Sequence, residues 1–196
     1  MLIDTLVEGL LDEAVAHRLL RHCNHTPGTT FGRRGVNYLR RSVAGFNVRS
    51  IHGAPILMLV DFMDTKEDCP PSVLSAWIPQ RAPTFLVRVV VPEVESWLLA
   101  DREAMANWLG ISVARLPSEP EAVVDPKQVL VNLARRSRRK RIRDALVPAK
   151  GISANVGPDY VGALGEFTET VWRPQVARQN APSLDRCLTR LCSLSP

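Results

Sequence analysis

The sequence predicts an α/β fold in which a mostly parallel sheet is flanked by helices. Three apolar runs, residues 1–7, 56–60 and 83–91, predict buried strands, and the last is rich in β-branched side chains. The first and third runs are followed directly by segments of helical periodicity. Strands that alternate with helices are typical of a parallel sheet, and the helical patterns that fill the rest of the chain predict an α-helical C-terminal extension.

The elements of the N-terminal half follow from spacing and from breaker residues. Leu11, Val15 and Leu19 lie at helical intervals, and Gly9 provides the tight turn that precedes them. Proline and glycine mark the loops. The predicted order is a strand at 1–7, a helix at about 10–23, a loop at 22–35, a helical pattern at 36–44, a short strand at 46–50, a strand at 56–60, a short helix at 72–77 and a strand at 83–91.

The second half of the chain is predicted to be helical. Asp125 and Pro126 form a typical helix start, with a capping side chain followed by proline at the first helical position. The predicted helices are 93–101, 102–109, a long basic helix at 126–146, 158–172 and 183–192. We therefore expect an α/β core at 1–110 and a helical extension at 111–196 packed on it, or one continuous domain.

Composition excludes several classes of protein. No apolar run approaches the roughly 20 residues that cross a bilayer, so we expect no membrane association. The N-terminus lacks the basic segment of a secretory signal. The four cysteines form no CxxC pair, and we expect reduced thiols in a cytoplasmic protein.

The positive charge is concentrated in one segment. The chain has a net charge of +5, and residues 135–143 hold seven positive charges and no negative one. Subtracting those seven leaves −2 for the rest of the chain. On a continuous helix five of these cations fall opposite the apolar side, which indicates a surface for a nucleic-acid backbone or, alternatively, a solvated helix face. These five are Arg135, Arg136, Arg139, Lys140 and Arg143.

A second possible phosphate-binding feature is the FGRRG segment at residues 31–35. It has two glycines and two arginines just before a predicted helix start. Backbone amides at a helix start can receive phosphate. The spacing matches no nucleotide-binding fingerprint, so an ordinary solvated loop is the alternative.

Acidic residues follow the predicted strands. Glu8 follows the first strand, Asp61 and Asp64 follow the second, and Glu95 follows the third. Ligands of open α/β sheets bind outside the carboxyl ends of the strands, so these side chains are expected to converge there. Oxygen ligands suit Mg²⁺ or Mn²⁺. The alternative is that these residues are helix caps or surface acids.

Several short motifs together resemble one known family. They are VEG at 7–9, LVDFMD at 59–64, VPEVESWLLAD at 91–101, DPK at 125–127 and the tail from NVGPDY to SLDR at 155–186. This combination resembles small bacterial Toprim-like proteins linked to phage defence and related to the overcoming-lysogenization-defect nucleases. The resemblance implies a Toprim-like fold and metal-dependent cleavage of phosphodiester bonds in DNA or RNA.

The resemblance also assigns roles to individual residues. It implies that Glu8 is a metal ligand or general base and that Asp61 holds the metal. The family pattern is Asp-x-Asp, whereas this chain has Asp-x-x-Asp, so either Asp64 acts through water or Glu95 supplies the missing carboxylate. Lys127 is expected to neutralise charge that develops on the phosphate.

Three functions remain open from the sequence. The first is a nuclease used in defence or as a toxin. The second is a non-catalytic module that binds nucleic acid or a partner, and the resemblance suggests an ATPase as that partner because this chain has no P-loop. The third is a phosphohydrolase acting on a small nucleotide, a substrate that would not need the long basic helix.

Overall fold

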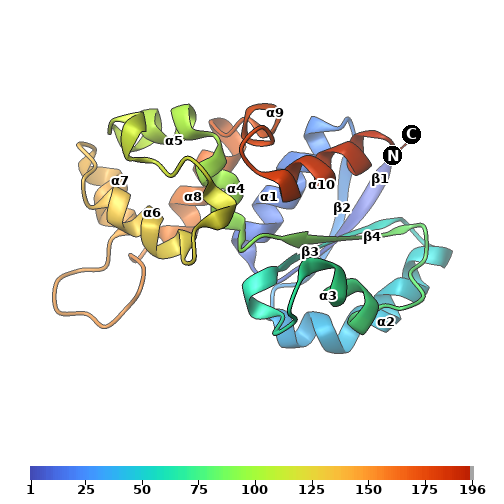
Figure 1. The fold of residues 1–196 in the computed structure, drawn as a ribbon. Coiled ribbons are helices and arrows are strands. Elements are labelled where there is room, and N and C mark those ends of the chain that lie inside the picture. The colour runs from blue at the N-terminus through green and yellow to red at the C-terminus, as the bar shows by residue number, and fades with distance from the viewer. Residues whose placement is uncertain (195–196) are drawn as a thin grey trace. The chain divides into compact units, whose positions relative to one another are not determined.

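The chain is divided into two compact units. The computed structural model describes residues 1–194. The first unit comprises residues 1–94 together with the segment from Ser183 onward, and the second unit comprises residues 95–182 (Figure 1). The chain thus leaves the first unit after Val94 and returns at Ser183. The division into a core at 1–110 and an extension at 111–196, or one continuous domain, stays a prediction.

The first unit is built on a four-stranded sheet in which every pairing is parallel. The expected α/β class, with a parallel sheet flanked by helices, is therefore confirmed. The strand order is β2-β1-β3-β4. The strands are β1 (Leu2–Val7), β2 (Thr26–Gly32), β3 (Ile56–Asp61) and β4 (Phe85–Val90).

Helices cover both faces of this sheet (Figure 1). Helices α1 (Leu10–His22) and α10 (Pro182–Cys192) lie on one face, and α2 (Val36–His52) and α3 (Pro70–Trp77) lie on the other. The core on the α2 side is formed by apolar side chains from the strands and both helices, including Leu39, Val43 and Val73. Burial of both faces explains why β3 is a continuous apolar run.

Strand β2 falls where the sequence predicted a loop, so that prediction was wrong. Pro27 and Gly28 are poor strand formers, but β2 is an edge strand, where proline is tolerated. It is held by tertiary contacts. The amide of Thr29 donates to Asp4 Oδ1 at 2.8 Å, and the hydroxyls of Thr5 and Thr30 are 2.9 Å apart.

The predicted strand at 46–50 was also wrong, because these residues continue helix α2. Leu39, Val43 and Ser50 are the buried positions of α2. Their spacing places them on one helical face that packs on the sheet. Residues 46–50 are therefore part of an amphipathic helix rather than a strand.

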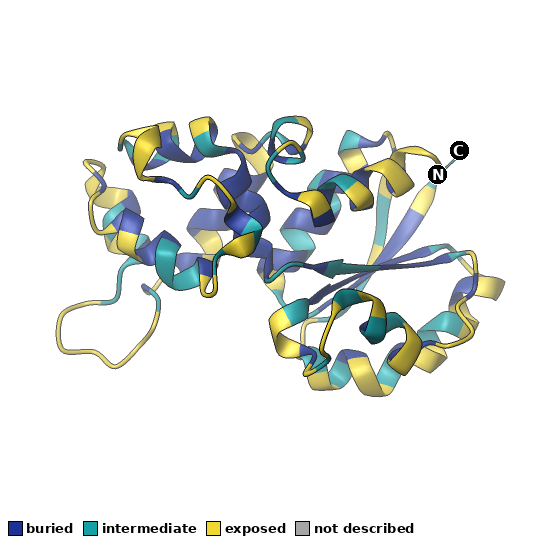
Figure 2. Ribbon diagram, viewed as in Figure 1, coloured by how far each residue is buried: buried dark blue, intermediate teal, exposed yellow. Residues whose placement is uncertain are grey.

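All the regular secondary structure of the second unit is helical. Its buried centre includes Trp97, Phe167 and Trp172, and the indole of Trp172 donates to the carbonyl of Trp97 at 3.1 Å. Figure 2 colours segments at the centre of this unit as buried. Arg173 donates two side-chain hydrogen bonds to the buried carboxylate of Asp101, at 2.9 and 2.7 Å. Its α-helices are α4 (Val94–Ala100), which starts one residue before the unit, α5 (Arg102–Leu109), α6 (Pro126–Ala134), α7 (Lys140–Leu146), α8 (Tyr160–Thr170) and α9 (Pro174–Ala177).

The long basic helix predicted at 126–146 is instead two helices, α6 and α7, with a break at residues 135–139. The break is fixed by the buried Ser137. Its hydroxyl donates to the carbonyl of Leu109 at 2.6 Å and accepts from the amide of Arg139 at 3.0 Å. A serine that bonds neighbouring backbone groups competes with the helical hydrogen-bond pattern.

A disulfide joins Cys23 to Cys192, which corrects the prediction that all four cysteines are reduced. Cys23 follows α1 and Cys192 ends α10, so the bond ties the two helices on that face of the sheet together. Cys69 and Cys187 are free thiols. Among residues 1–194, no helix is long and apolar enough to cross a membrane.

Candidate active site

Glu8 and Asp61 meet at the carboxyl edge of the sheet. Glu8 follows β1 and Asp61 ends β3, and these two strands are neighbours at the centre of the sheet. From β1 the chain continues to the neighbour on one side, and from β3 it continues to the neighbour on the other. This is the topological switch point of an open α/β sheet, where the crevice for a ligand forms.

Backbone hydrogen bonds fix both carboxylates at this point. Glu8 Oε1 accepts from the backbone amide of Asp61 at 3.0 Å. Asp61 Oδ1 accepts from the backbone amide of Val94 at 3.1 Å, and Asp61 is only 8% exposed. Both side chains are therefore oriented by main-chain groups of neighbouring elements rather than by mobile surface residues.

The FGRRG segment borders Glu8. The amide of Arg33 donates to the carbonyl of Val7 at 2.8 Å, and the amide of Gly35 donates to the carbonyl of Glu8 at 3.1 Å. Gly32 has a φ of +95°, and a side chain there would overlap the carbonyl oxygen of Val7. Gly35 precedes the first turn of α2, so the start of this 17-residue helix lies next to Glu8.

One of the two arginines of this segment is already paired. Both oxygens of Glu13 accept hydrogen bonds from the Arg33 side chain, at 2.7 and 2.5 Å. Burial acts to raise the pKa of Glu13, but hydrogen bonds from Arg33 and Thr30 outweigh it and the pKa is lowered. Arg34 is exposed, and its guanidinium lies over the ring of Tyr38, 5.5 Å from the centroid.

Asp64 is not held in the same way as Asp61. It ends a short 3₁₀ turn, Phe62–Asp64, and is exposed. The amide of Met63 donates to the carbonyl of Pro92 at 3.2 Å, which fixes the turn itself. The assignment of Asp64 as a ligand stays a prediction.

Glu95 and Lys127 contact each other in the second unit. Glu95 is 2% exposed, its Oε1 accepts from the hydroxyl of Tyr160 at 3.1 Å, and Lys127 Nζ is 3.6 Å from the same oxygen. Glu95 therefore has two protein partners at Oε1, one of them a cation. Its role as a metal ligand and the role of Lys127 at a phosphate stay predictions.

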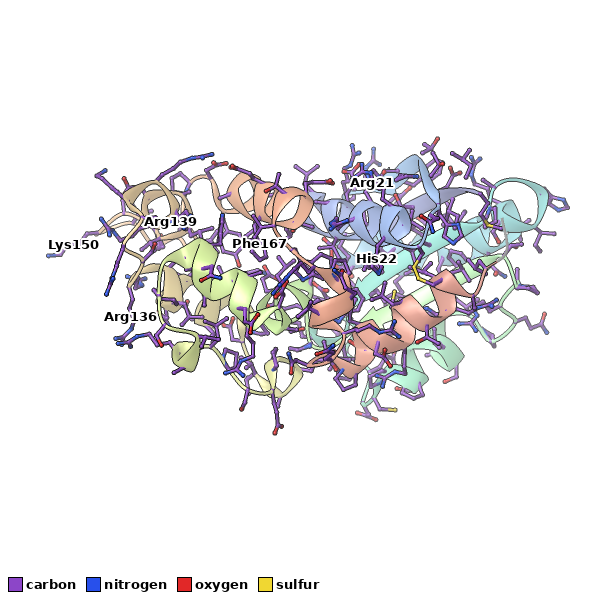
Figure 3. All side chains as sticks on the ribbon, turned by 90° about the horizontal axis from the view of Figure 1, so that it is seen from above. Arg21, His22, Arg136, Arg139, Lys150 and Phe167 are labelled. Atoms are coloured by element: carbon purple, nitrogen blue, oxygen red, sulfur yellow. A yellow bond between two sulfur atoms is a disulfide. The ribbon has the colours of Figure 1, made fainter. Side chains whose placement is uncertain are left out.

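The predicted nucleic-acid-binding cations are distributed over three local structures. Arg135 and Arg136 follow α6, Arg139 precedes α7, and Lys140 and Arg143 lie within α7. Figure 3 shows Arg136 and Lys150 extending outward from the ribbon of the second unit. Lys140 pairs with Asp144, and Arg143 donates to the carbonyl of Ser137 at 2.8 Å. These cations are therefore not one continuous helical arc.

The comparisons with known proteins give no relative for this chain. No family model, curated protein or solved structure matches it. The Toprim-like resemblance consequently stays a prediction from the short sequence motifs.

The donor set at this edge fits one kind of metal site. Within residues 1–194 no group of three or more His, Cys, Asp or Glu side chains is arranged to hold a metal ion. Glu8 and Asp61 supply two carboxylates. Mg²⁺ usually keeps several waters and binds one or two carboxylates plus substrate phosphates. The two residues therefore fit an ion whose coordination is completed by a phosphate, and they do not fit a site built from protein ligands alone.

One feature near the site was missed from the sequence. Residues 14–60 contain seven arginines and no acidic residue. The seven arginines are spread over 47 positions, unlike the dense run at 135–143. Among them, phosphate contact was predicted from the sequence only for Arg33 and Arg34. The signal that could have revealed it is the absence of acids rather than a local density of bases.

Proposed function

We propose that this protein is a Toprim-like, metal-dependent nuclease that cleaves phosphodiester bonds in DNA or RNA. The observation that carries the proposal is the pairing of Glu8 with Asp61 at the topological switch point of a parallel sheet. A role in bacterial phage defence or as a toxin is part of the same proposal, and it rests on the sequence resemblance.

In this mechanism Glu8 and Asp61 would hold a divalent cation, which polarises the phosphate and activates water when bound. A carboxylate has about four lone-pair sites, so each can accept a backbone hydrogen bond and also contact a cation. The Asp61 amide holds the Glu8 carboxylate in one orientation, from which it can accept a proton from the attacking water. The resemblance also assigns Lys127 to a phosphate, and within the second unit its Nζ lies 3.6 Å from Glu95 Oε1.

Cleavage of labelled single-stranded and duplex DNA and RNA, with Mg²⁺ or Mn²⁺, tests this function. Glu8→Gln and Asp61→Asn are expected to lower the cleavage rate at least about 100-fold while the proteins remain folded. Asp68→Asn is the matched control, because Asp68 is an exposed loop acid, and its rate should be unchanged. Metal-dependent cleavage that survives both Glu8→Gln and Asp61→Asn would show that the activity does not come from this site.

A non-catalytic binding module is the second candidate. The Asp-x-x-Asp spacing favours it, because Asp64 is exposed at the end of a short 3₁₀ turn and is not held as Asp61 is. It would bind nucleic acid, or a partner such as an ATPase, without cutting. Nucleic-acid binding by the wild type that is unchanged in Glu8→Gln, with no cleavage under any metal, would establish this alternative over the nuclease.

A further inference from the structure

Helix α2 carries an exposed basic face close to Glu8. Arg34 immediately precedes the helix, and Arg41 and Arg49 lie seven and fifteen residues further on. Arg41 and Arg49 lie eight residues apart within α2, so at 3.6 residues per turn they share one side of the helix. All three are exposed, and Figure 2 shows much of the outer surface of α2 as exposed.

The acids that neutralise this region are few. Arg33 pairs with Glu13, and Arg49 pairs with Asp4 at 3.5 Å. Within residues 1–194, Arg34, Arg40 and Arg41 have no acidic partner within 4.0 Å. A face with several unneutralised guanidinium groups attracts a polyanion.

The same face has a shallow groove, and one of the residues that line it is a glycine. The groove has a volume of about 330 Å³ and is lined by Arg41, Ser42, Gly45, Phe46 and Arg49. A side chain added at Gly45 would meet nothing within 4 Å. The helix backbone is therefore accessible between the two arginines, which allows a sugar–phosphate chain to approach closely.

Aromatic rings orient the arginines of this face. The guanidinium of Arg34 lies over Tyr38, and that of Arg49 lies 4.7 Å from the ring centroid of Phe31. Phe31 in turn packs against Phe46, with 5.1 Å between centroids. A guanidinium held near a ring by cation–π attraction keeps its N–H donors, and phosphate oxygens can accept from them.

We infer that the sugar–phosphate backbone of a nucleic acid binds to this α2 arginine face, which comprises Arg34, Arg41, Ser42, Gly45, Phe46 and Arg49. The face begins beside the site, because the amide of Gly35 donates to the carbonyl of Glu8 at 3.1 Å. A strand lying along α2 is thereby led toward Glu8 and Asp61. This inference rests on the proposed nuclease function and names the surface that delivers its substrate.

The basic segment at 135–143 is a weaker candidate for the same task. Lys140 pairs with Asp144, and Arg141 pairs with Glu166 at 2.6 Å. The groove of about 620 Å³ beside this segment also contains Asp159, so three carboxylates line it together with Arg139 and Arg141. Its electrostatic attraction for phosphate is therefore partly cancelled, whereas on the α2 arginine face Arg49 pairs with Asp4 but Arg34 and Arg41 have no acidic partner within 4.0 Å among the described residues.

Gly45→Glu, with Gly45→Ala as the matched control, tests the inference. A Cβ atom at Gly45 meets nothing within 4 Å, and alanine and glutamate both have a higher helix propensity than glycine, so both proteins should fold. The new carboxylate lies four residues from Arg41 and from Arg49, where it can pair with either. Fluorescence anisotropy with labelled oligonucleotides in EDTA should show at least about 10-fold weaker binding for Gly45→Glu than for Gly45→Ala, because only the glutamate adds a negative charge.

Two further measurements complete the test. Arg34→Ala and Arg41→Ala should each weaken binding and lower the slope of log affinity against log salt by about 1. Anionic phospholipid vesicles identify the other class of polyanionic partner. Wild-type protein that binds such vesicles but not oligonucleotides would overturn the inference, as would oligonucleotide binding by Gly45→Glu equal to that by the wild type.

These experiments distinguish failure of the α2 assignment from failure of the nuclease proposal. If Gly45→Glu binds and cleaves as the wild type does while Glu8→Gln abolishes cleavage, the α2 assignment is wrong and the nuclease stands. If Gly45→Glu abolishes binding but no metal supports cleavage by the wild type, the surface is supported and the nuclease proposal fails.

Discussion

The carboxylate of Glu8 accepts a hydrogen bond from the backbone amide of Asp61, with 3.0 Å between Oε1 and N. The two residues are 53 positions apart in the chain, and they meet because β1 and β3 are parallel neighbours. The bond makes the orientation of one proposed ligand depend on the backbone of the other. It also gives Glu8 a structural role that can be measured separately from any activity.

Replacements of Glu8 should therefore show how much this hydrogen bond contributes to stability, independently of any catalytic role of Glu8. Glu8→Ala leaves the amide of Asp61, a buried residue, without this acceptor and should lower the free energy of unfolding by about 1–3 kcal/mol. Glu8→Gln keeps an oxygen that can accept the bond and should lose less. Urea denaturation of the two variants measures the difference, and equal losses would mean that the hydrogen bond contributes nothing to stability.

Gly32→Ala should disturb the same edge of the sheet through the backbone. A methyl group at Gly32 would overlap the carbonyl oxygen of Val7, and the φ of +95° is unfavourable for alanine. We expect a loss of more than about 1 kcal/mol in the free energy of unfolding. Gly45→Ala is the control, since its methyl group meets open space in a helix. A melting temperature for Gly32→Ala at or above that of the wild type would contradict this account.

The disulfide between Cys23 and Cys192 should stabilise the first unit. Cross-linking residues 169 positions apart restricts the unfolded chain, and such bonds typically contribute about 2–4 kcal/mol. Cys192→Ser, or treatment of the wild type with a reductant, should lower the melting temperature. Cys69→Ser should not, because Cys69 is exposed and free. If reductant leaves the wild-type melting temperature unchanged, the bond is either absent or energetically neutral.

The two free thiols should differ sharply in reactivity. Burial raises the pKa of the Cys187 thiol to about 12, although the nearby Arg88 opposes this shift. Almost no thiolate exists there at mildly alkaline pH, and the thiolate is the nucleophile. Alkylation of the native protein, read by peptide mass spectrometry, should modify the exposed Cys69 and spare Cys187 until the protein is unfolded. Equal labelling of both in native protein would show that Cys187 is accessible.

The ion pair between Glu13 and Arg33 should make stability depend on acid pH. The pKa of Glu13 is lowered from 4.5 in the folded protein, so its contribution is present above pH 4.5 and is lost as the pH falls through the folded value. Denaturation curves from neutral pH down to about 3.5 should show a smaller loss of stability for Glu13→Gln than for the wild type. Glu119→Gln, which changes an exposed carboxylate, should keep the wild-type slope.

Local sequence patterns predicted the elements that are buried on both faces and those whose apolar residues recur with a clear period. The apolar run of β3, the helix after Glu8 and the cap formed by Asp125 were correct because each depends on nearby residues alone. Edge strand β2 could not be predicted in this way. Its pairing is supplied by β1, and its own residues, with a proline and two glycines, are those of a loop.

The break in the predicted basic helix has a similar origin. Nothing in the charge pattern of 135–143 marks a break, because arginine and lysine are good helix formers. Ser137 ends the helix by bonding to Leu109, which lies 28 residues earlier in the chain. Likewise, the disulfide joins two cysteines whose spacing gives no indication of a pair.

The sequence by itself determined that this is an α/β protein with acidic residues at the carboxyl ends of its strands, because strand composition and alternation with helices are local properties. Only the tertiary structure decided which acids meet. Strand order brings Glu8 to Asp61, whereas Glu95 pairs with Lys127 and Tyr160 in the second unit. Strand order and unit boundaries depend on which apolar surfaces bury one another, and that choice involves contacts between residues far apart in the chain.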